Sequence, residues 1–144
     1  MRLRVAIATV LNWLVVGVMF GTGVHYLAST EIMSYHQEVL EVPWAEQTPG
    51  CRTLILTLMK GTGMVGVTAG VALAVLLAIP FRRREGWSRW AILLIGGTVL
   101  VPMLLGAVRL RVETGAASPW WASAALLAIL CLGFWLTKDI ERTE

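Results

Sequence analysis

Cysteine is scarce in this chain, which has two among its 144 residues. Cys51 and Cys131 form no CxxC pair, so the sequence lacks the motif of the four-helix membrane redox enzymes. Cys51 falls in a polar stretch and Cys131 lies deep in an apolar run, and a disulfide between residues so placed is geometrically implausible. Both cysteines are therefore interpreted as small packing residues.

Acidic residues are also few, nine in all, and none lies within a long apolar run. A proton-driven transporter requires an ionisable acid inside the membrane, so the sequence disfavours that class. Histidine is limited to His25 and His36. The sequence contains no nucleophile elbow, and no donors for an oxyanion hole can be identified in it. It therefore does not indicate an enzyme.

Apolar residues are abundant: they make up 57% of the chain, and the mean hydropathy is +0.72. Such a composition is typical of an integral membrane protein. A helix that spans a bilayer needs about 20 mostly apolar residues, and four such runs occur, at about 5–25, 54–80, 90–109 and 120–137. We therefore predict an all-α, up-down-up-down four-helix membrane bundle that forms a single domain over residues 1–144.

Basic residues in the short connections predict the orientation. They precede the first run, separate the second from the third and follow the fourth, namely Arg2, Arg4, Arg82, Arg83, Arg84, Arg89, Lys138 and Arg142. Lysine and arginine in short loops remain on the cytoplasmic side, so both termini are predicted to be cytoplasmic. The arginine cluster is interpreted as this topology signal, because nothing else in the sequence supports binding to nucleic acid.

A polar outer segment at residues 28–52 separates the first two runs and contains four of the nine acids. Ser29 followed by Glu31 is typical of a helix start, since a hydroxyl accepts from free amides and an early acid suits the helix dipole. The apolar residues that follow have helical spacing up to Pro43. The segment is therefore predicted to form a short amphipathic helix that covers the outer end of the bundle as a lid.

Small residues four apart mark two of the apolar runs. Gly17 and Gly21 have GxxxG spacing in the first run, and Gly66 and Gly70 belong to a longer ladder of small residues in the second. Such spacing lets two helices approach closely in lipid. The contact can form within the chain, with another membrane protein or between copies of this chain.

Ionisable residues are predicted to meet near the outer surface. Counting about 20 residues from each inner boundary brings His25, Lys60 and Arg109 to one plane beneath the acidic lid. Charged groups at that depth mark functional sites or form a layer of ion pairs that fastens the lid. Together with Tyr26, Glu31 and His36, these residues are the six candidates for binding a quinone, another amphiphile or an anionic lipid.

A metal site is the second candidate at this end of the bundle. His25, Glu31 and His36 offer imidazole and carboxylate ligands that suit zinc, iron or copper. If residues 25–36 formed one helix, the two histidines would be about 16 Å apart. A break near Ser29 is therefore required to bring them together.

The plan of four short spans with a polar segment after the first resembles the small bacterial inner-membrane proteins of the DoxX-like superfamily. The resemblance implies an inner-membrane bundle that associates with respiratory or redox partners, and it carries over no residue. The leading hypothesis is a non-catalytic accessory or interaction subunit of a larger membrane assembly, based on the ladders of small residues. The alternative is a membrane oxidoreductase or binding protein that holds a metal, quinone or anionic lipid at the outer rim.

Overall fold

The computed structural model describes residues 2–138, and this part of the chain is helical and contains no strand. Arg142, one of the predicted topology signals, lies outside the described residues. The elements are α1 (Arg2–Ala28), α2 (Ser34–Gln37), η1 (Trp44–Glu46), α3 (Pro49–Leu76), η2 (Leu77–Phe81), α4 (Gly86–Thr114) and α5 (Trp120–Leu136). The prediction of an all-α bundle is confirmed.

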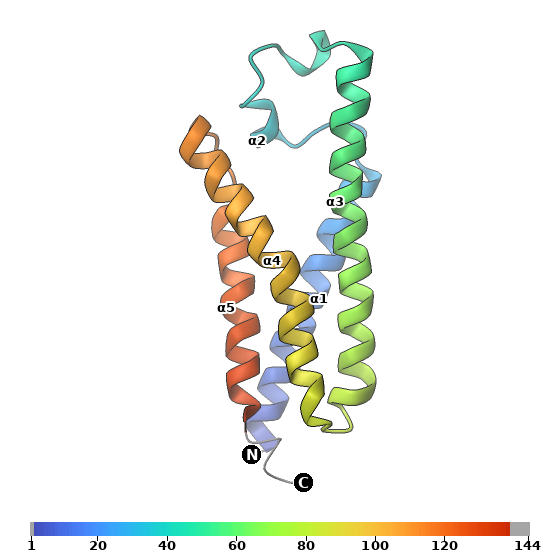
Figure 1. Ribbon diagram of the computed structural model, residues 1–144, viewed down its shortest axis with the longest axis vertical. Coiled ribbons are helices and arrows are strands. Elements are labelled where there is room, and N and C mark those ends of the chain that lie inside the picture. The colour runs from blue at the N-terminus through green and yellow to red at the C-terminus, as the bar shows by residue number, and fades with distance from the viewer. Residues whose placement is uncertain (1, 139–144) are drawn as a thin grey trace.

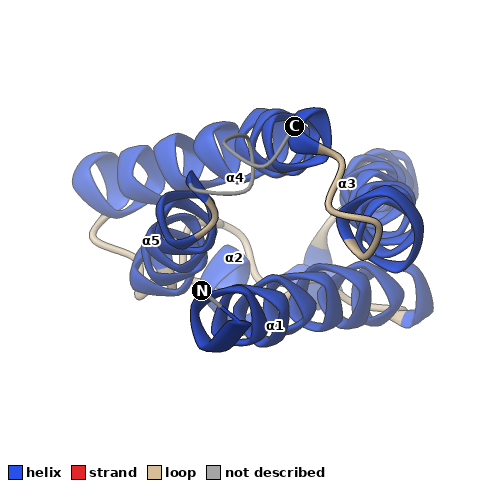
Figure 2. Ribbon diagram, turned by 90° about the horizontal axis from the view of Figure 1, so that it is seen from below, coloured by secondary structure: helices blue, strands red, loops and turns tan. Residues whose placement is uncertain are grey.

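The four long helices α1, α3, α4 and α5 alternate in direction along the bundle (Figure 1). Seen along the bundle axis they form a ring (Figure 2). Residues 29–48, between α1 and α3, form the structure's lid. We call the end of the bundle that carries them the lid end, and the opposite end, with the connection from α3 to α4, the arginine end. Three stretches are long and apolar enough to cross a membrane, Leu3–Ala28, Pro49–Phe81 and Gly86–Thr114, whereas α5 is apolar but shorter, with 17 residues.

Local sequence explains where these helices begin and end. At the start of α3, the Thr48 hydroxyl accepts a hydrogen bond from the backbone amide of Cys51 at 3.3 Å, and Pro49 takes the first helical position. At its other end, Pro80 has no amide hydrogen to donate, and the chain widens into the π-helical turn η2. Gly115 ends α4 in the left-handed conformation, with φ of 75°.

Glycines bring α1 and α3 into backbone contact. A Cβ atom added to Gly23 would lie 2.7 Å from the Gly63 carbonyl oxygen, and one added to Gly63 would lie 2.8 Å from the Gly23 carbonyl oxygen. Gly66 and Gly70 continue the contact against Met19 and Phe20 of α1. Only residues without a side chain permit two helices to approach so closely.

The apolar core occupies the arginine end and the middle of the bundle. Its buried members include Val15, Leu73, Leu77, Ile92 and Leu130, which come from α1, α3, η2, α4 and α5. A buried cluster drawn from every long helix holds the ring together at this end.

Polar groups are buried within the same end of the bundle. Asn12 of α1 is 3% exposed and packs against Gly133 of α5, where an added Cβ would lie 3.0 Å from its side-chain oxygen. The Arg89 guanidinium lies over the Phe134 ring at 4.7 Å. The small size of Gly133 and the aromatic face of Phe134 therefore let α5 pack beside these two polar side chains.

The lid is less helical than predicted. The expected amphipathic helix is a single turn, α2, and the prediction that Ser29 starts it is wrong. The Ser29 hydroxyl donates to the His25 carbonyl oxygen at 2.7 Å, so Ser29 completes α1, and Met33 precedes α2. Ile32 anchors the lid, because its side chain is only 4% exposed.

Candidate functional site

A cavity of about 670 Å³ occupies the lid end of the bundle. The walls come from α1, α3, α4 and α5, and the lid contributes residues that include Ile32, Val39 and Leu40. Met19 and Leu100 belong both to the buried core and to the cavity lining, so the cavity begins where the core ends. Its size falls within the range of roughly 300–1,000 Å³ that is typical of sites for small molecules.

The cavity exists because small residues line one side of it. On α4 and α5 the lining includes Gly106, Ala107, Ala122 and Ser123, whose side chains project little into the space. A Cβ atom added to Gly106 would meet nothing within 4 Å. The lid end of α4 also leans away from α3 (Figure 1). Together these features leave the helices apart at the lid end, whereas the same helices pack tightly below.

A pair of tyrosines provides hydroxyl groups at the lid end of the cavity. The Tyr26 hydroxyl of α1 and the Tyr35 hydroxyl of α2 are 2.6 Å apart, and both residues line the cavity. The rings of Tyr35 and His36 are 4.2 Å apart. The pair therefore connects the lid to the first helix and places three ring side chains on the cavity wall.

Burial keeps the Tyr35 and His36 side chains uncharged at neutral pH. It raises the pKa of Tyr35 far above its ordinary value of 10.0, and the neighbouring Tyr26 hydroxyl adds to this effect. Burial also lowers the pKa of His36 from its ordinary value of 6.5. At neutral pH both residues therefore present neutral hydrogen-bonding groups to the cavity.

Ser118 adds a buried hydroxyl to the cavity lining. It lies in the turn between α4 and α5, and it is 3% exposed. Its oxygen has no hydrogen-bond partner among residues 2–138. Buried hydroxyls are almost always hydrogen-bonded, and a molecule inside the cavity supplies the missing partner once the Ser118 side chain turns towards it.

One hydrogen bond fastens the lid to the opposite side of the bundle. The backbone amide of Ala117 donates to the Glu38 carboxylate at 2.8 Å. Glu38 follows α2 directly, and Ala117 precedes Ser118. This contact and the tyrosine pair hold the two sides of the lid over the cavity.

The structure separates the residues that were predicted to form a rim. Among the six ligand-binding candidates, Tyr26 and His36 line the cavity, whereas His25, Glu31 and Lys60 are exposed and do not belong to its lining.

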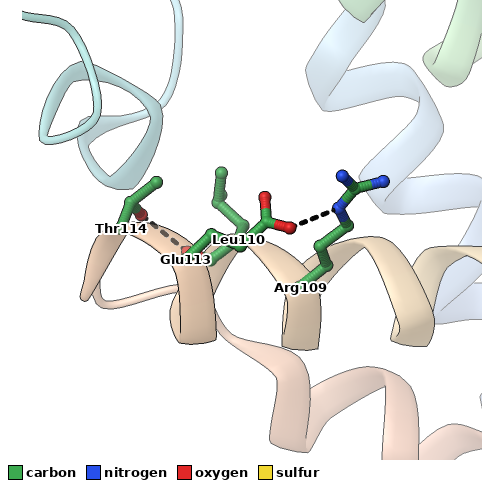
Figure 3. Close-up of polar contacts among 4 residues, drawn as sticks. All are labelled: Arg109, Leu110, Glu113 and Thr114. Carbon is green, nitrogen blue, oxygen red and sulfur yellow. Dashed lines mark hydrogen bonds and ion pairs between the residues drawn. The ribbon is translucent and has the colours of Figure 1, made fainter.

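Arg109 belongs to an exposed surface of α4. Its Nε atom contacts Glu113 at 2.8 Å, as the spacing predicts, and its side chain is 77% exposed (Figure 3). The same figure shows Thr114 donating to the Leu110 carbonyl oxygen at 2.6 Å. Arg109 therefore pairs within its own helix and does not contribute charge to the cavity lining.

The metal site predicted at His25, Glu31 and His36 does not form in this structure. Within residues 2–138, no three His, Cys, Asp or Glu side chains lie close enough together to hold a metal ion. The physical reason is that His25 is exposed at the end of α1, whereas His36 points its ring towards the cavity lining from a separate turn.

The four predicted packing glycines have two different environments. Gly66 and Gly70 contact α1, as described above. Gly17 and Gly21 meet nothing within 4 Å and are exposed on α1. The prediction of a partner protein or a second copy on that face stays a prediction.

Sequence reasoning missed several residues that shape the site, namely Gly23, Gly63, Tyr35 and Ser118. Tyr35 adjoins His36, and a search for hydroxyl groups beside the candidate histidine would have found it. No sequence signal distinguishes Ser118 from an ordinary turn residue.

Comparisons with models of protein families, with curated proteins and with solved structures find no match to this chain.

Proposed function

We propose that this protein is a membrane protein that binds an apolar small molecule in the cavity beneath the lid. The observation that carries the proposal is the cavity itself, which is bounded by four helices and the lid and has a mostly apolar lining. Sites for small molecules have this character, with a few polar groups that fix the orientation of the ligand. Tyr26, Tyr35, His36 and Ser118 are groups of that kind.

The size of the cavity argues that it is filled. In a protein core, each Å³ of sealed void costs about 24 cal/mol, so for this partly open cavity a figure on the order of 10 kcal/mol is an upper bound. The whole stability of a typical domain is about 5–15 kcal/mol. An apolar molecule from the surrounding bilayer removes this cost, because its hydrocarbon groups contact the apolar side chains of the lining.

The same proposal includes a location for the protein. Three apolar stretches are long enough to cross a bilayer, and α5 supplies a fourth crossing of 17 apolar residues. The arginines of the α3 to α4 connection favour a cytoplasmic arginine end, with both termini on that side. The resemblance to the DoxX-like superfamily supports the bacterial inner membrane.

A second candidate function is that of an accessory subunit in a larger assembly. The exposed Gly17 and Gly21 favour it, because they leave a shallow face on α1 that no other part of residues 2–138 covers. Under this hypothesis the protein extracted gently from its own membrane carries stoichiometric partner subunits, and Gly17→Leu releases them. Native mass spectrometry reads both bound small molecules and bound subunits in one measurement.

Filling the cavity tests the leading proposal. In the Gly106→Phe variant, the new ring enters open space in the cavity, so we expect the loss of most of the small molecule that copurifies with the wild-type protein. Gly97→Phe is the matched control, because Gly97 is in the same helix, also meets nothing within 4 Å and does not line the cavity. Equal retention of the bound molecule by both variants in native mass spectrometry would sink the proposal.

A further inference from the structure

We infer that the molecule in the cavity is an uncharged lipophile whose head group accepts hydrogen bonds through a carbonyl oxygen. The inference rests on the proposed function and names the class of ligand for the same site. The head group lies at the lid end, beside Ser118, His36 and the tyrosine pair. The hydrocarbon tail extends from there towards Met19 and Leu100, where the core begins.

The first argument concerns charge. The described residues that line the cavity include no lysine, arginine, aspartate or glutamate. The nearby cation Arg109 pairs with Glu113 on an exposed helix surface. A phosphate or carboxylate in the cavity would lose its hydration without gaining an opposite charge, which costs several kcal/mol or more. An anionic lipid is therefore the wrong occupant.

The second argument concerns Ser118. Its hydroxyl is buried in the lining and has no partner in the described part of the chain. A purely hydrocarbon ligand would leave this hydroxyl unsatisfied, at a cost of about 1–3 kcal/mol. A ligand with a polar oxygen satisfies it and gains a hydrogen bond.

The third argument concerns the number of donors. Two tyrosine hydroxyls carry two protons, and the single hydrogen bond between Tyr26 and Tyr35 uses one of them. The other proton remains available. Neutral His36 carries one ring N–H, and Ser118 carries one O–H. These four residues therefore offer up to three donors, whereas a carbonyl oxygen has two lone pairs to accept them.

The fourth argument concerns position. Glu38 is two residues after His36, and it accepts from the amide of Ala117, which adjoins Ser118. The turn that carries Ser118 therefore meets the turn that carries His36. Tyr35 and Tyr26 are joined by their own 2.6 Å contact. These four polar residues consequently gather at one end of a mostly apolar space, as an amphiphilic ligand with one polar end requires.

A binding series with four probes of comparable tail length tests the inference. The delipidated full-length protein in detergent micelles is titrated with decylbenzoquinone, dioctanoylglycerol, decanoate and decane, and bound probe is counted by native mass spectrometry. We expect the quinone or the glycerol ester to bind at least tenfold more tightly than decane and decanoate. Tight binding of the quinone alone identifies a free quinone as the source of the carbonyl, and tight binding of the ester alone identifies a lipid.

Two outcomes contradict the inference while leaving the proposed function intact. Binding of decane as tightly as the carbonyl probes would show that the polar groups are not used, and preferential binding of decanoate would show that the site takes an anion. Failure of all four probes to bind, with no effect of Gly106→Phe, would instead remove the proposed function itself.

The Ser118→Ala variant tests the hydrogen bond between the Ser118 hydroxyl and the carbonyl oxygen of the ligand. Removal of one neutral hydrogen bond weakens the carbonyl probe about threefold to tenfold and leaves decane binding unchanged. Ser118→Thr keeps the hydroxyl and restores affinity, and Ser34→Ala, on the exposed surface of α2, has no effect. Because the Ser118 hydroxyl has no partner in the described chain, its loss does not lower the thermal midpoint of the ligand-free protein. Unchanged affinity of Ser118→Ala for the carbonyl probes would overturn the assignment of this residue.

Discussion

At the scale of single residues, the direction in which a side chain points decides which candidates reach the cavity. Lys60 and Met59 are adjacent in α3, yet Met59 lines the cavity and Lys60 is exposed. Counting residues along a helix gives the depth of each position. It does not give the rotation of about 100° per residue that decides which way the side chain faces. For this reason the sequence prediction fell at the end of the bundle that contains the cavity but grouped residues from different helix faces.

We predict that the protonation of His36 makes opening of the lid dependent on pH. Burial lowers its pKa in the closed lid from the ordinary 6.5, so the open lid takes up a proton first as the pH falls. The stabilisation of the closed lid is complete above about pH 6.5 and is lost as the pH falls towards the lowered pKa. We expect the lid amides, corrected for intrinsic rates, to exchange hydrogen up to tenfold faster per pH unit in this window.

The control for this prediction is His36→Phe, which keeps a ring at the position and removes the titrating group. The carboxylates of the lid, Glu38 among them, remain in this variant. Persistence of the same pH dependence in His36→Phe, measured by hydrogen exchange with mass spectrometry, would assign the effect to those carboxylates and rule out His36.

At the scale of helices, the sequence predicted which long helices exist and in what order, but it predicted fewer of the contacts between them. Each of the four apolar runs coincides with one long helix, except that the second continues into η2 and the fourth ends one residue beyond α5. Some 20 consecutive apolar residues leave a membrane chain few alternatives to a helix. The ladder containing Gly66 and Gly70 does pack on α1. Its partners on α1 include Gly23, whereas the predicted pair Gly17 and Gly21 faces away. The spacing of small residues shows that a helix has a face that permits close packing. One helix can have several such faces, so the spacing does not show which of them packs.

The close contact between α1 and α3 predicts a strong effect of Gly63→Leu. The new Cβ atom would lie 2.8 Å from the Gly23 carbonyl oxygen and 2.9 Å from the Tyr26 Cβ, so the helices must separate. We expect a destabilisation of about 3 kcal/mol or more, measured by denaturant unfolding in micelles.

Gly61→Leu is the matched control for that substitution. Gly61 is two residues away in the same helix, is exposed and meets nothing within 4 Å, so the same change there costs little. Equal stability of the two variants would show that α1 and α3 do not pack in this way.

At the scale of the whole molecule, the bundle is solid at one end and hollow at the other. Leu77, Phe81 and Ile92 are buried near the arginine end, whereas the lid end surrounds a cavity. Hydrophobic patterning could predict the bundle, since every helix carries apolar residues all round. The hollow could not be predicted, because it depends on how far α4 leans from α3 and on small residues such as Gly106.

The orientation of the molecule in the membrane is tested by labelling single cysteines in a background that carries Cys51→Ser and Cys131→Ser. With a cytoplasmic arginine end, Arg83→Cys resists an impermeant thiol reagent added to intact cells, whereas Glu41→Cys in the lid reacts. Both positions are exposed in the structure, so access within the fold does not differ between them. The reverse pattern of labelling would invert the proposed topology.

The unequal lengths of the helices have a consequence for the surrounding bilayer. The apolar stretch Pro49–Phe81 has 33 residues, or about 50 Å at 1.5 Å per residue, whereas α5 has 17, or about 26 Å. A hydrocarbon layer of about 30 Å matches neither length. If all four helices cross the bilayer as proposed, the lipids beside α5 must thin while α3 tilts or projects, so hydrophobic mismatch acts with opposite sign on two sides of the protein. A change in membrane thickness would relieve the strain on one side of the ring and increase it on the other.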